Sequence, residues 1–124
     1  MVFDMVIHEL SPGIIALCFT GRLVLGNRLS DVEHAILKRI RQGHRMVLVD
    51  LSGLEFIESA GIGMLAVWSG VTEREGGKLA VAGATGQVEQ MLELSRLDRV
   101  LGMYPALEPA HNALAGWTPV ARGK

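Results

Sequence analysis

The chain has one cysteine, few aromatic residues and no long apolar run. Because Cys18 is the only cysteine among 124 residues, no internal disulfide can form, and its apolar neighbours predict a small buried thiol. No stretch approaches the roughly 20 apolar residues that a membrane-spanning helix needs. Residues 1–4 lack the basic segment that opens a secretory signal. These absences predict a cytoplasmic protein that does not insert into a membrane.

An excess of charge of one sign is also absent. The formal net charge of −1 argues against a protein that binds nucleic acid or anionic lipid through its charge. The four histidines are scattered, without the spacing typical of a metal site. There is neither a phosphate-binding loop of the G-x-x-x-x-G-K type nor a G-x-S-x-G turn. We therefore expect no nucleic-acid partner, no metal, no cofactor and no catalytic activity.

The chain alternates between strand and helix patterns and has enough apolar residues, 49%, for one well-filled core. The patterns predict strands over 5–10, 14–20, 47–51, 78–82 and 100–103, and helices over about 27–42, 59–74, 87–94 and 108–115. Strand–helix–strand units imply right-handed parallel crossovers, whereas the turn at 11–13 implies an antiparallel first hairpin. We expect a single-domain α/β fold over residues 1–116, with a mixed sheet of four to five strands, helices mainly on one face and a flexible tail at 117–124.

Ser59 opens a predicted helix directly after the apolar strand 47–51 and a short loop. A serine at this place can cap the helix by accepting a hydrogen bond from a free backbone N–H. It can also carry a phosphate, because the helix dipole and the free amides favour an anion there. The residue chemistry leaves both roles open. Gly61 and Gly63 form an isolated G-x-G, which predicts close backbone approach around the serine rather than a dinucleotide site.

The helix that follows Ser59 has no clearly polar face over residues 61–71. A surface helix normally shows one, so this helix is either covered by another or docks a partner. Met64, Trp68 and Val71 form one candidate outward stripe, and methionine and tryptophan suit adaptable interfaces. We expect a partner surface on which Met64 or Trp68 is at least partly exposed, beside the loop that carries Glu58.

Residues 50–63, with the sequence DLSGLEFIESAGIG, resemble the signature D-x-S-G-x-x-F-x-D-S-S-G-x-G of the STAS family. That family includes domains of sulphate transporters and the anti-sigma factor antagonists. The resemblance continues in TGRL at 20–23 and GGKLAVAG at 76–83, and so covers most of residues 3–116 in the right order. The first serine of the D-S-S-G step is the phosphorylated residue of the family, and Ser59 occupies its place. The resemblance implies a STAS-like fold.

The function that the resemblance implies is that of an anti-sigma factor antagonist-like binding module. The unphosphorylated form would bind a kinase-type anti-sigma factor and free the sigma factor. Phosphorylation of Ser59 by that kinase would release the antagonist, and a phosphatase would reset it. Whether the protein forms a homodimer is a question that the sequence leaves open. The expected partner-binding residues are Val24, Glu58, Ser59, Ala60, Gly61, Met64 and Trp68.

Two positions depart from the family pattern and favour an alternative. Glu58 replaces the usual aspartate, and Val24 stands where antagonists often have an aspartate. In the alternative, the protein is a non-switching STAS accessory subunit of a membrane transport complex or a signalling scaffold, and Ser59 is only a helix cap. A third interpretation is a small-molecule or nucleotide binder that uses the helix N-terminus.

Overall fold

The computed structural model describes residues 2–24, 26 and 28–115. The predicted tail at 117–124 lies outside this range. The elements are β1 (Asp4–Ser11), β2 (Ile14–Leu23), α1 (Arg28–Arg41), β3 (Met46–Ile57), α2 (Ser59–Arg74), β4 (Lys78–Ala82), α3 (Gly86–Leu94), the 3₁₀ helix η1 (Leu97–Arg99), β5 (Gly102–Tyr104) and α4 (Leu107–Ala115). No helix within the described range is both long and apolar enough to cross a bilayer.

The five strands form one mixed sheet in the order β1-β2-β3-β4-β5. β1 and β2 are antiparallel, joined by the turn at Pro12 and Gly13, while β2, β3, β4 and β5 pair in parallel. Each parallel connection passes through a helix, as a crossover requires. The predicted mixed sheet with an antiparallel first hairpin is confirmed.

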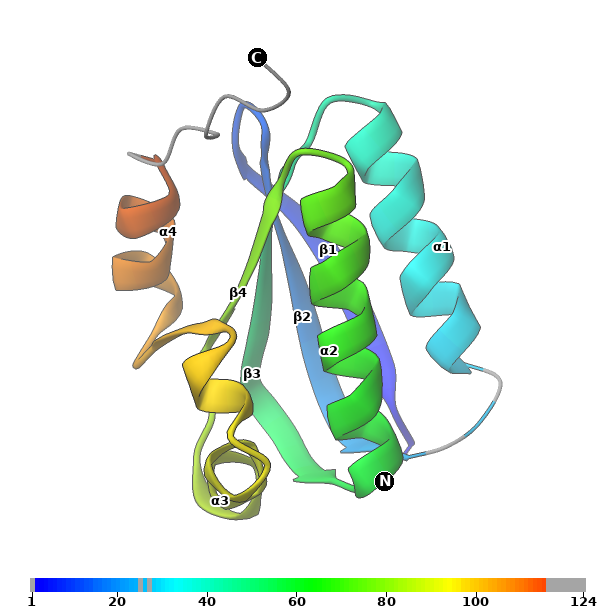
Figure 1. Ribbon diagram of the computed structural model, residues 1–124, viewed down its shortest axis with the longest axis vertical. Helices are drawn as coiled ribbons and strands as arrows, with labels where there is room; N and C mark the ends of the chain where they lie inside the picture. Colours follow the sequence, from blue (N-terminus) through cyan, green and yellow to red (C-terminus); the bar gives the residue numbers. More distant parts are fainter. Residues whose placement is uncertain (1, 25, 27, 116–124) are drawn as a thin grey trace.

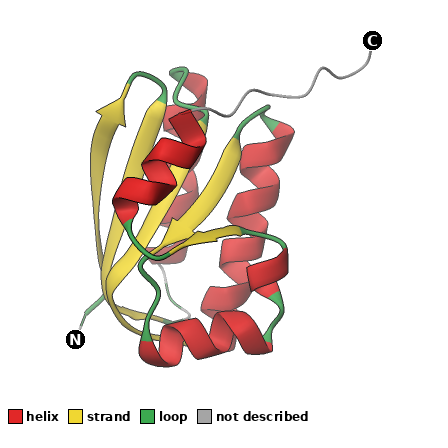
Figure 2. Cartoon of the chain, turned by 90° about the vertical axis from the view of Figure 1, so that its left-hand side faces the viewer, coloured by secondary structure: helices red, strands yellow, loops and turns green. Residues whose placement is uncertain are grey.

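Three helices cover one face of the sheet and one covers the other (Figure 1). The larger core joins the strands to α1, α2 and α3 through side chains such as Ile36, Leu65 and Val88. Beneath α4, alanines of the strands meet Ala110 and Leu114 in a smaller cluster. Figure 2 shows α3 lying across the end of the molecule at a steep angle to the long helices. The prediction that the helices pack mainly on one face is confirmed.

β3 is longer than the predicted strand, which ended at residue 51. It continues to Ile57 because β2 also extends, and the two strands pair in parallel as far as Leu23 and Ile57. Gly53 lies inside this strand, where a larger residue would not fit, because a Cβ atom there would approach the methyl group of Thr20 to 2.9 Å. β4 pairs with β3 only from Met46 to Asp50. The last residues of β3 therefore have a strand on one side only.

The apolar helix α2 is covered on both sides, because it packs against both α1 and α3. Trp68 is fully buried, with its ring in an edge contact with Phe19 at 6.1 Å between centroids. The expected outward position of Trp68 and Val71 is thus wrong, and burial explains the missing polar face. Met64 is half-buried, so the expectation that Met64 or Trp68 is partly exposed holds through Met64 alone.

Candidate functional site

Ser59 is the first residue of α2, and its side chain is exposed. Glu58 is the N-cap residue, with extended backbone angles of φ −104° and ψ 175°, and no side chain caps the helix. The Ser59 hydroxyl makes no hydrogen bond to any residue that the structure describes. Of the two roles left open for Ser59, that of a helix cap is not found, because the residue lies one position inside α2 and Glu58 holds the N-cap position. The hydroxyl is free to meet a partner or an enzyme.

The first turn of α2 is packed tightly onto the end of β2. The N–H group of Glu58 donates to the carbonyl oxygen of Leu23 at 3.1 Å. A Cβ atom on Gly61 would lie 2.8 Å from Cγ1 of Ile57 and 2.9 Å from the Leu23 oxygen, whereas Gly63 faces open space. Close backbone approach is confirmed for Gly61 and wrong for Gly63. Gly61 is buried, so its role is to seat the helix rather than to contact a partner.

The other expected partner-binding residues form a small surface at this end of the sheet. Val24 directly follows Leu23 and is 37% exposed. Glu58, Ala60 and Met64 are half-buried. Since Leu23 accepts the Glu58 hydrogen bond, Val24 lies beside the loop that leads to Ser59. The structure thus brings the loop residues together with Val24 and separates them from the buried Trp68.

A shallow hollow of about 270 Å³ opens next to Ser59, between α2 and α3. It is lined by Ser59, Ile62, Met91, Leu94 and Ser95, and we call it the α2–α3 groove. Leu94 is 80% exposed at its edge. The sequence analysis missed Met91 and Leu94, because a helix of nine residues shows no signal that separates an outward leucine from a core leucine. The groove offers an apolar contact beside the exposed serine hydroxyl.

The side chain of Gln87 at the start of α3 binds the backbone just before Ser59. Its Oε1 accepts the N–H group of Ile57 at 2.9 Å, and its Nε2 donates to the carbonyl oxygen of Ile57 at 2.8 Å. Sequence reasoning missed Gln87 too, since nothing in the chain marks one glutamine among several polar helix residues. Only the tertiary structure brings α3 to the end of β3.

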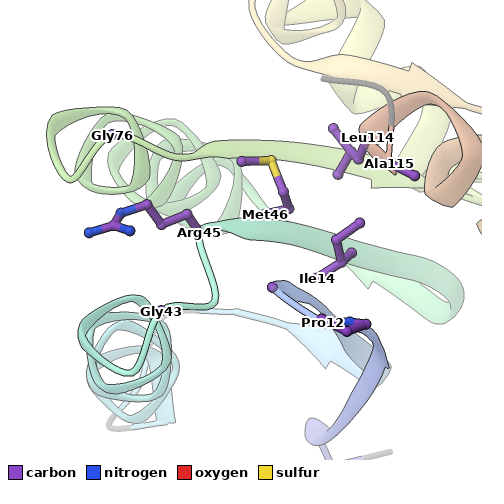
Figure 3. A pocket seen from close by; sticks show the side chains of 9 residues that line it. Pro12, Ile14, Gly43, Arg45, Met46, Gly76, Leu114 and Ala115 are labelled. Atoms are coloured by element: carbon purple, nitrogen blue, oxygen red, sulfur yellow. The ribbon is translucent and has the colours of Figure 1, made fainter. Parts of the chain in front are cut away.

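A second hollow, of about 290 Å³, lies at the opposite end of the parallel strands (Figure 3). It is lined by Ile14 and Met46 at the amino ends of β2 and β3, and by Leu114 of α4. The guanidinium of Arg45 points away from Leu114, and its Nε donates to the carbonyl oxygen of Glu75 at 3.1 Å. Ser59 follows the carboxyl end of β3, so this hollow does not belong to the same site.

Cys18 lies on β2 opposite Asp50 of β3 and is half-buried. Burial raises the pKa of the Cys18 thiol, and the negative charge of the Asp50 carboxylate, which also accepts its hydrogen bond, raises it further. The same carboxylate accepts the N–H group of Ser52 at 3.0 Å. These contacts favour the neutral thiol and a structural role for both side chains. Across the described residues, no three histidine, cysteine or acidic side chains gather as a metal site would require.

Solved structures with this fold include proteins described as anti-sigma factor antagonists. One from Mycobacterium paratuberculosis has a TM-score of 0.78 at 22% identity, covering 92% of this chain and 95% of its own. The anti-sigma factor antagonist SpoIIAA in its unphosphorylated form has a TM-score of 0.78 at 17% identity, covering 93% and 99%. The murine anion transporter Slc26a9 matches at 0.73 and 15% identity, over 88% of this chain and 19% of the transporter. These likenesses establish the fold.

No match to a curated protein was found. A family model described as "Mlab, STAS domain" matches residues 19–105. This match runs from the second half of β2 to the end of β5 and includes the loop that leads to Ser59, so it covers well over half of the chain. The chain belongs to the STAS domain family.

Proposed function

We propose that the protein is an anti-sigma factor antagonist-like binding module that changes partners when Ser59 is phosphorylated. The observation that carries the proposal is the exposed Ser59 hydroxyl, which lies at the first turn of α2 and at the edge of an apolar groove. The exposure makes the hydroxyl accessible to a kinase. The groove supplies apolar surface that a partner can bury, which is the main source of affinity in protein association.

The proposed partner is a kinase-type anti-sigma factor, which would rest on Val24, Glu58, Ser59, Ala60 and Met64 together with Met91 and Leu94 of the groove. Trp68 and Gly61 would support this surface from inside the fold, since both are buried. Met64 and Met91 suit such a surface, because methionine is enriched at interfaces and adapts to irregular partners. In this proposal the protein acts by binding in the cytoplasm and carries out no catalysis.

Phosphorylation would weaken this contact through charge alone. A phosphate adds about −1.5 to −2 charges and three strong acceptor oxygens. At the edge of an apolar groove and next to Glu58, that charge must lose its water or meet a like charge when the partner binds. The helix itself would remain folded, because an anion suits its first turn. A phosphatase would then restore the binding form.

The test is a titration of three forms against a kinase-type anti-sigma factor encoded beside this protein. Ser59→Ala should bind equally well before and after incubation with ATP. Ser59→Asp should bind at least about tenfold more weakly, which corresponds to about 1.4 kcal/mol. The phosphorylated protein should bind most weakly. Asn112→Asp on the far helix α4 adds the same charge away from the site and serves as the control. Mass spectrometry after incubation with ATP should find the phosphate on Ser59. Equal affinities and an unmodified Ser59 would contradict the proposal.

The second candidate is a non-switching accessory subunit of a membrane transport complex, or a scaffold. It is favoured by Glu58 and Val24, each of which stands in place of an aspartate of the family pattern and lies at the site itself. In this candidate the groove still docks a partner, and Ser59 is an ordinary surface residue rather than a cap. Co-purification with transporter subunits, with the same affinity for all Ser59 variants, would support it over partner switching.

A further inference from the structure

The end of β3 lacks a strand on one of its two sides. Ile57 is fully buried and pairs with Leu23 of β2, while β4 stops pairing at Asp50. The N–H of the next residue, Glu58, points to β2. Since neighbouring residues of a strand direct their backbone groups to opposite sides, the N–H and C=O groups of Ile57 point away from β2. Buried groups of this kind need a partner.

Gln87 supplies that partner with a side chain instead of a strand. Its amide accepts from the Ile57 N–H and donates to the Ile57 carbonyl oxygen, at 2.9 and 2.8 Å. A glutamine amide has one acceptor and two donors side by side, so it can match both backbone groups at once. Among natural uncharged side chains of this length, only glutamine carries a hydrogen-bond donor and an acceptor side by side.

The same side chain ties the serine segment to the α2–α3 groove. Ile57 precedes Ser59 by two residues, and Gln87 precedes Met91 and Leu94 by four and seven residues on α3. Residues that are four and seven positions apart lie along one face of a helix, so Gln87, Met91 and Leu94 share a face of α3. The hydrogen bonds of Gln87 thus tie the segment that leads into Ser59, on one wall of the groove, to the helix that carries Met91 and Leu94 on the other wall.

We propose that Gln87 is a positioning residue that fixes the Ile57–Ser59 segment against α3, so that the serine and the α2–α3 groove form one rigid docking surface. When its hydrogen bonds are removed, the segment loosens and the first turn of α2 frays, while the rest of the sheet stays intact. The structural part of this inference stands without the proposed function. Its consequence for partner exchange rests on that function.

Amide exchange measures the structural part in the isolated protein. Gln87→Met keeps the side-chain length and removes both hydrogen bonds, so the protection of the Ile57 amide should fall about tenfold or more. The amides of Leu48 and Val49 in the centre of β3 should keep their protection. Gln90→Met on the exposed side of the same helix is the matched control and should leave Ile57 unchanged. Unchanged protection of Ile57 in Gln87→Met would overturn the inference.

Gln87→Glu tests the chemistry of the contact. Below about pH 4.3, the usual carboxyl pKa, the acid can accept from the Ile57 N–H and donate to its carbonyl oxygen, as the amide does. Above that pH, a carboxylate faces the carbonyl oxygen with no proton to donate. Protection of Ile57 relative to Val49 should therefore be near the parent value in acid and lost at neutral pH. A merely space-filling Gln87 would show no such pH dependence.

A thiol at position 59 reports on the first turn of α2. In a Cys18→Ala background, Ser59→Cys should react with iodoacetamide with a pKa below the usual 8.5, because a helix N-terminus favours the thiolate. Adding Gln87→Met should move that pKa toward the usual value, and adding Gln90→Met should not. A pKa that does not respond to Gln87→Met would contradict the positioning role.

The consequence for function is read from a double-mutant cycle with the kinase-type anti-sigma factor. Gln87→Met should reduce the affinity ratio between Ser59→Ala and Ser59→Asp severalfold, because a loose segment can turn the added charge away from the interface. A changed Ile57 exchange together with no affinity difference between the Ser59 variants would support the positioning role and overturn the proposed partner switching. If Ser59→Ala and Ser59→Asp differ strongly in affinity and Gln87→Met leaves their ratio unchanged, the coupling between Gln87 and Ser59 in partner binding is overturned.

Discussion

At the residue scale, Ser59 differs from an ordinary first-turn serine because no capping hydrogen bond holds its hydroxyl. The backbone of Glu58 takes the cap position instead, in an extended conformation. A side chain with no structural task can be modified without loss of the fold. A hydroxyl that makes no stabilising hydrogen bond can be phosphorylated and restored while the protein stays folded, as a reversible switch requires.

Ser59→Ala should therefore change the free energy of unfolding by less than about 0.5 kcal/mol, whereas removal of a true N-cap typically costs about 1 kcal/mol. Ser59→Asp should stay close to the parent as well, since an acid in the first turn suits the helix dipole. Chemical denaturation of both variants measures this. A loss of 1 kcal/mol or more in Ser59→Ala would show that the hydroxyl does cap α2.

Cys18 should be a poor nucleophile because its pKa is raised by burial and by Asp50. With a raised pKa, the thiolate forms only at higher pH, so alkylation by iodoacetamide should begin at higher pH than for a free thiol. Asp50→Asn removes the negative charge and should shift the alkylation curve to lower pH. Asp98→Asn, an exposed acid on η1, should leave the curve in place. A shift to higher pH in Asp50→Asn would contradict this account.

At the scale of elements, α2 and β4 have the bounds that the sequence predicts, and β3 does not. The bounds of α2 follow from a local pattern, an apolar run that begins after Ser59 and ends before two glycines, although the serine hydroxyl does not cap the helix. The continuation of β3 through Ser52 and Gly53 depends on β2 lying alongside, which no local pattern shows. The candidates Ser59, Glu58 and Val24 came from the resemblance to a family motif, and they lie near one another at the end of β2 and β3. The expected outward position of Trp68 was wrong, because its burial depends on helices that no local pattern shows. Gln87 and Leu94 belong to the site only through tertiary packing.

The contact between α2 and β2 depends on a glycine at position 61. Gly61→Ala should destabilise the protein by about 1–3 kcal/mol, because the new Cβ would overlap Ile57 and the Leu23 oxygen. Gly63→Ala, two residues along the same helix, meets no atoms and should stabilise by about 0.5–1 kcal/mol through helix propensity. Thermal unfolding of the pair compares the two sites directly. Equal effects of the two substitutions would show that α2 can shift away from β2.

At the scale of the whole molecule, exposed apolar surface lies at the end of the sheet that carries Ser59. The chain belongs to the STAS domain family, and its fold is that of solved anti-sigma factor antagonists. Three helices seal the larger core, so the stability of the fold does not depend on Leu94, which is 80% exposed. The groove beside Ser59 is therefore available for binding at little cost in stability.

Leu94→Asp should leave the free energy of unfolding within about 0.5 kcal/mol of the parent, as is usual for exposed positions. Binding to the proposed partner, a kinase-type anti-sigma factor, should weaken at least about tenfold, since a charge would enter an apolar contact. Ala113→Asp, exposed on α4 across the sheet, should bind like the parent. Chemical denaturation measures the stability of both variants, and titration measures their affinity for the partner. An unchanged affinity of Leu94→Asp would show that the groove is not part of the interface.

The strand order β1-β2-β3-β4-β5 also follows the order in which the ribosome makes the chain. Each new strand adds to the edge left by the one before it, and no strand has to insert between two that are already paired. Every strand thus pairs with the strand next to it in the chain, which keeps the contacts of the sheet comparatively local and favours fast folding. The segment with Gln87 emerges after Ser59, so the serine hydroxyl is made before the groove beside it is complete.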